Sequence, residues 1–429
     1  MRDGLAFHNG QKVTSADIVA SIPRAAKQDP MMQLMVKRLA RMEAVDPTHF
    51  RLVFSKPYAL VAPSLAGAGA MMMRAEDIAA AGDKPMVTTV GSGPFKFNNA
   101  GYLPGAKVMF DRNAAYVPRA EPADGMAGGK RVLVDRVEWL ILPDLQTRVS
   151  ALIKGEVDLL DQLPHDGIQS LAGRKDIVVE QSNKLGNMAF LRMNTLQPPF
   201  NDVRARRALA MLVDQKDYLA AAFGTDQAWW SECFAWLGCG SVNASEAGSE
   251  AYRKPNPAEA KRLLAEAGYK GEKIVILTTQ EIPLIDGLAQ VTADKLRSIG
   301  VNVDVQASDW GSLVVRRARK DPADKGGWSI FQSGGDITTL SQPATNILID
   351  ARCDQNNYVG WPCSDRLEAM RIALIEAPDP GKFVDYNKAL WEELPSLLLG
   401  RFLQPVAYRA NISGLQHGLL LAFWNISKK

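Results

Sequence analysis

Apolar residues recur at helical spacing in several segments of the chain, which predicts amphipathic helices there. The segment 14–26 begins with Thr14 and Ser15 and carries an acid in its first turn, and 256–269 begins with an Asn-Pro pair. Such residues are typical of helix starts, and a glycine after the last apolar position is typical of a helix end. The complete set of predicted helical segments is 14–26, 145–160 (a helix that stops at Gly155 before a short strand), 201–224 (a pair of helices), 256–269 and 285–300.

Segments rich in β-branched residues alternate with these helices and predict strands at 107–113, 136–143, 273–279 and 301–308. Residues 256–308 therefore contain helix, strand, helix and strand in turn, a pattern that predicts an α/β domain with a partly parallel sheet. The Gly- and Pro-rich tract 118–131 predicts an exposed loop.

The composition limits the functional classes. A chain of 429 residues is long enough for two or three domains. The net charge of +3 and the scattered Lys and Arg residues argue against a nucleic-acid partner. No apolar run approaches the roughly 18 residues that a transmembrane helix needs.

The four cysteines form two local pairs, Cys233 with Cys239 and Cys353 with Cys363. Their C-x5-C and C-x9-C spacings, with four scattered histidines, do not match a zinc site. A C-x-x-C redox pair is absent, and no nucleophile motif surrounds any cysteine. We favour two disulfides, each stabilising by roughly 2–3 kcal/mol and each indicating an oxidising compartment. Four unpaired buried thiols are the alternative.

Seven stretches in chain order resemble the extracellular solute-binding proteins of the oligopeptide, dipeptide and nickel ABC importers. They are 2–24, 91–116, 137–160, 194–214, 256–269, 295–310 and 403–415. The resemblance implies an α/β, two-lobed periplasmic-binding-protein fold of type II, of the large peptide-binding class. Its mixed sheets would form a first lobe over 1–186, a second lobe over 187–400 and a return to the first lobe over 401–429. Two hinge segments would cross near 187–195 and 401–409.

The resemblance also implies function. The chain would be a periplasmic, monomeric substrate-binding component without a cofactor or enzymatic activity. It would capture a peptide or peptide-like solute between its lobes and deliver it to an inner-membrane ABC permease. A ligand-loaded sensor or chaperone, or a thiol enzyme, is the alternative. Family members carry a signal peptide and several dozen residues before the stretch that matches 2–24. We therefore expect a shortened first lobe with an unpaired sheet edge.

Candidate ligand contacts follow from the resemblance and from side-chain chemistry. Peptide-binding relatives often have a Trp followed closely by an Asp that pairs with the ligand's α-amino group. Here Ser333-Gly334-Gly335 replaces the aromatic residue, and Asp336 is either that acid or a turn residue that caps its own backbone. The predicted contacts are Trp229, Trp230, Trp236, Trp310, Gln332, Asp336, Gln404 and Tyr408. Core packing is the equal alternative for the tryptophans at 229–236.

Four further residues have alternative roles. Arg192, Arg401 and Arg409 would pair with a ligand carboxylate or, as we favour, form salt bridges between the lobes. His8 precedes an Asn-Gly turn and is expected to pack or cap rather than to bind a metal. Nickel or haem, known in the wider family, would need His or Met residues in the cleft, and no cluster of them stands out.

Overall fold

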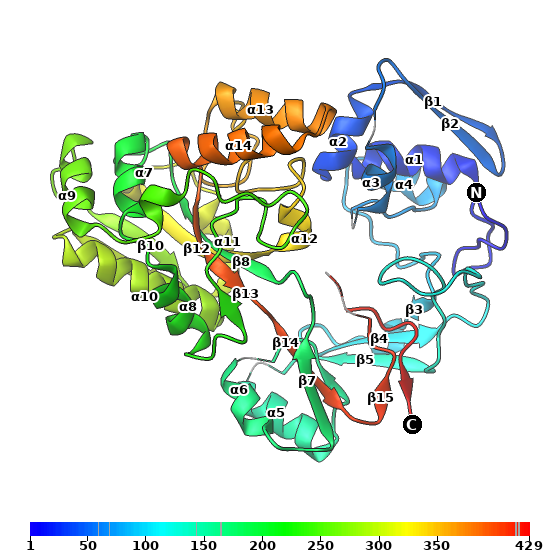
Figure 1. The fold of residues 1–429 in the computed structure, drawn as a ribbon. Coiled ribbons are helices and arrows are strands. Elements are labelled where there is room, and N and C mark those ends of the chain that lie inside the picture. Colours follow the sequence, from blue (N-terminus) through cyan, green and yellow to red (C-terminus); the bar gives the residue numbers. More distant parts are fainter. Residues whose placement is uncertain (59, 68, 143, 164, 417, 419–420) are drawn as a thin grey trace. The chain divides into compact units, whose positions relative to one another are not determined.

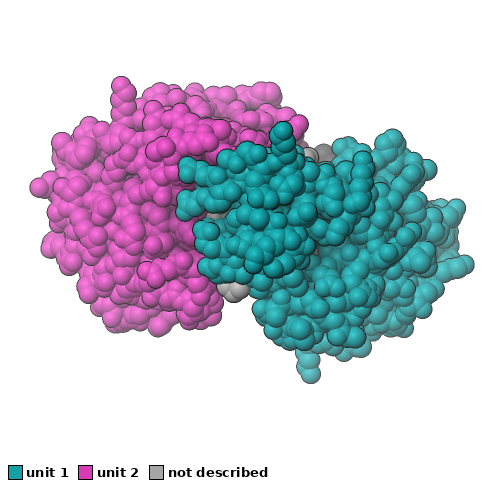
Figure 2. Space-filling view, turned by 90° about the horizontal axis from the view of Figure 1, so that it is seen from below, with its two compact units in different colours: residues 1–180, 405–429 teal, residues 181–404 magenta. Residues whose placement is uncertain are grey.

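The computed structural model describes residues 1–429 except 59, 68, 143, 164, 417 and 419–420. The chain divides into two units (Figure 2). Unit 1 comprises residues 1–180 and 405–429, and unit 2 comprises residues 181–404. The chain therefore passes from one unit to the other twice. The backbone N–H of Ser182 donates to the carbonyl of Gln404 at 3.0 Å, so the two connecting segments lie side by side.

The first connection lies upstream of the predicted crossing at 187–195, and that prediction is wrong. Those residues include β8 (Asn187–Met193), a buried strand inside the sheet of unit 2. An apolar run of this kind is typical of an interior strand rather than of a connecting segment. The second connection, between Gln404 and Pro405, lies within the predicted 401–409.

Unit 1 is built from short helices and several small sheets (Figure 1). Its helices are α1 (Ser15–Ala25), α2 (Pro30–Val36), α3 (Val61–Ala66), α4 (Ala75–Ala81), α5 (Leu145–Lys154) and α6 (His165–Leu171). One hairpin joins β1 (Leu39–Asp46) and β2 (His49–Phe54). A second sheet has the order β3 (Phe95–Phe97), β4 (Lys107–Arg112), β5 (Arg136–Leu140). A third has the order β6 (Leu159–Leu160), β14 (Pro405–Arg409), β7 (Ile177–Gln181), and β15 (Ile412–Ser413) pairs with β16 (Ser427–Lys428).

Local sequence signals explain the helix ends of unit 1. The Thr14 N–H donates to the carboxylate of Asp17 at 2.8 Å, which completes a capping box at the start of α1. Asp144 accepts from the Thr147 N–H at 2.7 Å at the start of α5. Gly155 ends α5 at a φ of 77°, which is the left-handed conformation that glycine adopts readily. These features confirm the predicted helix at 14–26 and the predicted helix that begins at 145 and stops at Gly155, and β6 is the short strand expected after it.

Unit 2 surrounds a six-stranded sheet with the order β11, β10, β12, β8, β13, β9 (Figure 1). Its strands besides β8 are β9 (Trp230–Ser231), β10 (Ile274–Thr278), β11 (Val303–Ala307), β12 (Ile330–Asp336) and β13 (Leu397–Phe402). Its helices are α7 (Val203–Ala210), α8 (Gln215–Phe223), α9 (Pro257–Glu266), α10 (Pro283–Ser298), α11 (Trp310–Arg317), α12 (Ile337–Leu340), α13 (Asp365–Glu376) and α14 (Pro380–Glu393).

The predicted unit 256–308 is confirmed as α9, β10, α10 and β11. Strands β10 and β11 pair in parallel, and β10 also pairs in parallel with β12. Every residue of β10 is buried, as expected for a parallel strand covered on both faces. The predicted strand at 136–143 is β5, and residue 143 lies outside the described residues.

The core of unit 2 covers both faces of this sheet. A large cluster includes side chains from both faces, among them Phe190, Tyr218 and Tyr386, all below 2% exposed. A smaller cluster surrounds Trp328 and Phe331. Within the described part of the chain, no helix has the length and apolar character that a membrane crossing requires.

Candidate functional site

One edge of the sheet in unit 2 gathers the ends of its parallel strands. Strands β12 and β13 both run antiparallel to β8, so β13 runs in the same direction as β10, β11 and β12. These four strands end at the same edge, which we call the carboxyl edge. Ligands of open α/β sheets bind outside this kind of edge. Both connecting segments also leave unit 2 at this edge. Asp336 and Phe402, at the ends of β12 and β13, each pair with Asn187, the first residue of β8, so the chain before β8 and the chain after β13 both lie here.

Asp336 ends β12 and caps α12 at the carboxyl edge. One carboxylate oxygen accepts from the Thr339 N–H at 3.3 Å, and the other accepts from the side-chain amide of Asn183 at 2.6 Å. Asn183 is itself buried, and its amide oxygen accepts from the Leu185 N–H at 3.0 Å. The capping role that we considered for Asp336 is therefore present. A carboxylate offers about four lone-pair directions, so Asp336 retains acceptor capacity for a ligand.

The first disulfide braces this region. Cys233 and Cys239 are bonded, as predicted, and Gly238 within the loop has a φ of 81°. A methyl group at Gly238 would lie 2.3 Å from Cγ2 of Ile337, so the loop backbone packs directly against the first residue of α12. The disulfide loop therefore helps to fix the position of Asp336.

Two of the predicted tryptophans lie at the carboxyl edge. Trp310 begins α11 shortly after β11, and its backbone N–H donates to the Glu281 carboxylate at 2.9 Å. Trp229 precedes β9, and its carbonyl accepts from the Leu403 N–H at 2.8 Å. Both side chains are half-buried. Gln404, on the second connecting segment, follows directly after Leu403, so the structure brings Trp229, Trp310, Asp336 and Gln404 to one edge.

Three other predicted contacts lie inside unit 2 instead. The Trp230 indole donates to the carbonyl of Gly224 at 2.8 Å, and Trp236 is 1% exposed and packs edge-to-face on Trp391. Gln332 is fully buried, and its amide donates to the Thr292 hydroxyl at 3.0 Å. These side chains fill the core because they come from strand positions and a loop that face the helices. For Trp230 and Trp236 the core-packing alternative is the one that the structure supports.

Comparisons with known proteins support the same assignment of fold and class. The family model "Bacterial extracellular solute-binding proteins, family 5 Middle" matches residues 1–356. This chain belongs to that family. A relative described as a probable peptide ABC transporter periplasmic-binding protein, y4tO of Sinorhizobium fredii, is 40% identical over all of this chain and 82% of its own length.

More distant proteins resemble this family 5 protein as well. The glutathione-binding protein GsiB of Shigella dysenteriae is 25% identical over 96% of this chain and 79% of its own length. The solved structure of AgaA from A. tumefaciens R10, in complex with agropinic acid, has a TM-score of 0.81 and 23% identity. That match covers 99% of this chain and 85% of AgaA, and it confirms the two-lobed binding-protein fold.

The three arginines of this solute-binding protein have other partners than we predicted. Arg192 is fully buried in unit 2 and donates to the carbonyls of Tyr358 and Val359 at 3.0 Å each. Arg401 donates to the carbonyl of Leu185 at 2.7 Å, within the same unit. Both therefore order backbone segments inside unit 2, and the favoured assignment as salt bridges between lobes is wrong for them.

Arg409 likewise bonds within its own unit. Its guanidinium donates to the carbonyl of Leu152 at 3.3 Å, in the last turn of α5. A cation at a helix C-terminus stabilises the unpaired carbonyls there. The bonds that the structure gives Arg409 thus lie within unit 1, which corrects the prediction of a salt bridge between lobes.

Tyr408 and His8 also belong to unit 1. Tyr408 lies on β14, and burial, followed by a hydrogen bond with the Glu180 side chain, raises its pKa to about 12. The ring of His8 bonds to the backbone of Gly91 and Gly93, at 3.2 and 3.1 Å. Its packing role is therefore confirmed. Burial lowers the pKa of His8, which favours the neutral ring.

The second disulfide, Cys353–Cys363, is also present, so all four cysteines are paired. This pairing excludes the two interpretations that need a free thiol. Among the described residues, no three His, Cys, Asp or Glu side chains come together as a metal site.

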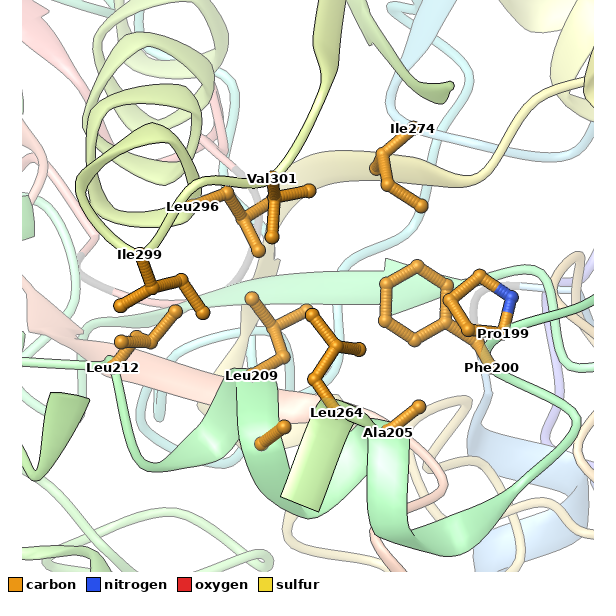
Figure 3. Close-up of a pocket in the computed structure, with 11 residues that line it drawn as sticks. Pro199, Phe200, Ala205, Leu209, Leu212, Leu264, Ile274, Leu296, Ile299 and Val301 are labelled. Atoms are coloured by element: carbon orange, nitrogen blue, oxygen red, sulfur yellow. The ribbon is translucent and has the colours of Figure 1, made fainter. Parts of the chain in front are cut away.

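A cavity in unit 2 lies away from the carboxyl edge (Figure 3). Aliphatic and aromatic side chains from α7, α9, α10 and the start of β10 surround it, including Leu209, Leu264 and Leu296. Its volume of about 10 Å³ is at the lower limit for one water molecule. We interpret it as a packing gap between helices and sheet rather than as a ligand site.

Sequence reasoning missed Asn183 and Gly238, which hold Asp336 in place. Asn183 lies 153 residues before its partner, and no motif marks it. The close approach of Gly238 to Ile337 depends on the tertiary fold.

Proposed function

We propose that this protein captures a peptide or peptide-like solute in the periplasm and delivers it to an inner-membrane ABC permease. The carrying observation is the family match over residues 1–356, together with 40% identity to the y4tO relative over the whole chain. The two disulfides support an oxidising compartment. The relatives described as a probable peptide ABC transporter protein and a glutathione-binding protein support a small polar solute with amino or carboxyl groups.

Within unit 2, we propose that the solute contacts the carboxyl edge. Asp336 would accept from a ligand ammonium, because its carboxylate is held in place by Asn183 and by α12. The half-buried rings of Trp229 and Trp310 would cover apolar parts of the solute. A fixed carboxylate loses little conformational freedom on binding, which favours affinity.

Native mass spectrometry of protein purified without reducing agent tests this function. A bound molecule of a few hundred daltons that is lost on denaturation supports the proposal and identifies the solute by its mass. That solute, added back to protein refolded from denaturant, should then bind in calorimetry. A folded protein that binds neither the co-purified material nor a library of di- to pentapeptides would contradict the proposal.

The role of Asp336 is tested separately by Asp336→Asn. Asparagine caps helices as well as aspartate does, so this change removes the charge and preserves the cap of α12, although its amide N–H2 replaces the oxygen that accepts from Asn183. Losing one charge-assisted contact should weaken binding of an amine-containing solute by about 10- to 100-fold. Asp214→Asn is the matched control, because Asp214 caps α8 in the same way. Helix α8 ends beside Trp230 and Phe402, so Asp214 lies at the opposite edge of the sheet. Equal affinities of the two variants would exclude Asp336 as a ligand contact.

A further inference from the structure

The loop that Cys353 and Cys363 close carries its disulfide at the protein surface. Both of these cysteines are exposed, whereas Cys233 is fully buried and Cys239 is half-buried. Thiol–disulfide exchange begins when a thiolate reaches a sulfur atom, and exposed disulfides are among those that exchange readily. A dithiol in solution therefore reaches Cys353–Cys363 before it reaches the first disulfide.

The backbone inside this loop has two residues other than glycine in the left-handed conformation. Gln355 has a φ of 57° and Trp361 has a φ of 49°. This conformation is unfavourable for a residue with a large side chain, so it persists only where the surrounding structure imposes it. Lys320 contributes, because its ammonium donates to the side-chain oxygen of Gln355 at 3.0 Å and lies over the ring of Trp361. Opening the disulfide removes another constraint, so we expect the reduced loop to relax.

Tyr358, inside the same loop, connects it to α11. Its hydroxyl accepts from the Arg317 guanidinium at 3.1 Å, and the guanidinium carbon lies 5.6 Å from the centre of the Tyr358 ring. The same carbon lies 5.5 Å from the centre of the Phe331 ring and 5.4 Å from that of Trp310. Aromatic faces attract a cation at such distances. Three rings and one hydroxyl thus hold the guanidinium in place.

Arg317 in turn orients the ring of Trp310. The two residues are seven positions apart on α11, which puts them on one face of the helix about two turns apart. Helical side chains point toward the N-terminus of their helix, so the long side chain of Arg317 reaches back to the Trp310 ring. That ring is half-buried at the carboxyl edge. A continuous chain of contacts therefore runs from the disulfide loop through Tyr358 and Arg317 to the carboxyl edge.

We propose that reduction of Cys353–Cys363 by a dithiol lowers the affinity for the solute, and that Arg317 is the positioning residue that transmits this change to Trp310. The inference rests on the proposed contact between the solute and the Trp310 ring. It adds a redox dependence to solute binding, with a dithiol as the reductant.

The exchange follows ordinary thiol chemistry. One thiolate of the dithiol attacks a sulfur of the disulfide, forms a mixed disulfide and releases the other cysteine as a thiolate, which takes up a proton. The second thiol of the dithiol then attacks the mixed disulfide as a thiolate and releases the remaining cysteine, which is protonated in turn. The protein gains two electrons and two protons, and the dithiol becomes a disulfide.

The first disulfide limits the size of the effect. It stays closed, so the loop around Gly238 keeps its contact with α12, and Asp336 keeps its position. The reduced protein therefore loses the contribution of the Trp310 ring but retains the carboxylate. An aromatic contact of this kind corresponds to an increase in the solute Kd of about 3- to 10-fold.

Differential alkylation of the folded protein tests the first step. After brief treatment with dithiothreitol, iodoacetamide should label Cys353 and Cys363 and leave Cys233 and Cys239 unlabelled in a peptide map. Near-ultraviolet circular dichroism confirms that the treated protein is folded. Absence of label on Cys353 and Cys363, or earlier labelling of the first pair, would overturn the proposal.

The position of the Trp310 ring is measured without any solute, by ¹⁹F NMR of protein that contains 5-fluorotryptophan. Reduction should shift the Trp310 resonance and leave that of Trp391 unchanged, because Trp391 lies in the core beside Trp236. Phenylalanine substitutions assign the two resonances. Arg317→Met should shift the Trp310 resonance in the oxidised protein as well. Arg316→Met is the matched control on the same helix, since the Arg316 guanidinium donates to backbone carbonyls, and it should leave Trp310 unchanged.

Binding is measured by native mass spectrometry with a cysteine-free library of di- to pentapeptides. Peptides that bind the oxidised wild type should bind about 3- to 10-fold more weakly after reduction. Arg317→Met should show the weaker binding in both redox states, because its ring is already released. Cys353→Ser/Cys363→Ser should also show it and should not respond to dithiothreitol.

The two measurements separate this inference from the proposed function. If no peptide binds the oxidised protein, the proposed function fails, and the Trp310 resonance alone decides whether the disulfide positions the ring. An affinity that reduction leaves unchanged, or a Trp310 resonance that neither reduction nor Arg317→Met moves, would overturn the inference.

Discussion

Arg192 is buried completely in unit 2 without a carboxylate among its hydrogen-bond partners, and replacing it with methionine tests how this charge is accommodated. The guanidinium donates to the carbonyls of Tyr358 and Val359 at 3.0 Å each and to the Ser396 hydroxyl at 2.6 Å. Burial lowers its pKa to about 10, which shows that removing the charge from water is unfavourable. Methionine fills similar space but leaves these acceptors without their donor.

The expected cost follows from these contacts. A hydrogen bond from a charged donor contributes about 1.5–3 kcal/mol, so three such bonds sum to several kcal/mol. Removing the buried charge recovers part of this free energy, because a charge is costly to bury. We therefore expect Arg192→Met to lower the free energy of unfolding by about 3 kcal/mol. For a unit of this size, that change lowers Tm by roughly 6–12 °C.

The second disulfide should act together with Arg192. Two of the arginine's acceptors, Tyr358 and Val359, lie inside the loop that Cys353–Cys363 closes. Replacing both cysteines with serine should cost about 3 kcal/mol by itself, from the loop entropy of the unfolded chain. The triple variant should lose about 1–2 kcal/mol less than the sum of the two changes, because each change loosens the same loop.

Urea unfolding followed by tryptophan fluorescence, without reducing agent, measures these free energies. Arg207→Met is the matched control, since the exposed guanidinium of Arg207 also donates to a backbone carbonyl, that of Glu392. It should change stability by less than about 0.5 kcal/mol. An Arg192→Met variant as stable as the wild type would refute the argument that the guanidinium supports the loop. Strict additivity with the disulfide change would refute their coupling.

Three further predictions concern other parts of the molecule. Because the pKa of Tyr408 is raised to about 12 in the folded state, its protonated form contributes stability below about pH 10. This stability is lost as the pH rises toward 12, and thermal unfolding of Tyr408→Phe should show a smaller decline over that range. Replacing Cys233 and Cys239 with serine should lower the urea-unfolding free energy of unit 2 by about 2 kcal/mol, whereas a reductant should then have no further effect at this loop. Gly238→Ala should cost about 2 kcal/mol or more and weaken solute binding in calorimetry, because the new methyl group would collide with Ile337.

Local signals in the sequence were sufficient for the helices and for the parallel part of the sheet. The Asn256 cap, the proline after it and the alternation of helix and strand over 256–308 each depend on neighbouring residues, and the structure confirms them. The cysteine pairs were also predictable, because short loops leave few alternatives to a local bond.

Residues whose role depends on distant parts of the chain were not predictable in the same way. The segment around Arg192 was interpreted as a hinge, although its consecutive buried side chains belong to the interior strand β8. Arginine, tryptophan and glutamine suggest ligand contacts by their chemistry, but burial decides whether that chemistry faces a ligand or the protein's own backbone. Arg192 and Gln332 are fully buried and bond to internal partners.

Asp336 differs from these residues because the sequence and the tertiary fold both indicate it as a ligand contact. The sequence identified it as a carboxylate near the expected ligand contact, and the fold places it where four parallel strands end beside both connecting segments. A carboxylate there that served the fold alone would need only its cap on α12, yet Asn183 holds its second oxygen as well. Two independent restraints on one half-buried acid restrict its orientation beyond what a four-residue helix requires, which is the property that a ligand-binding carboxylate needs.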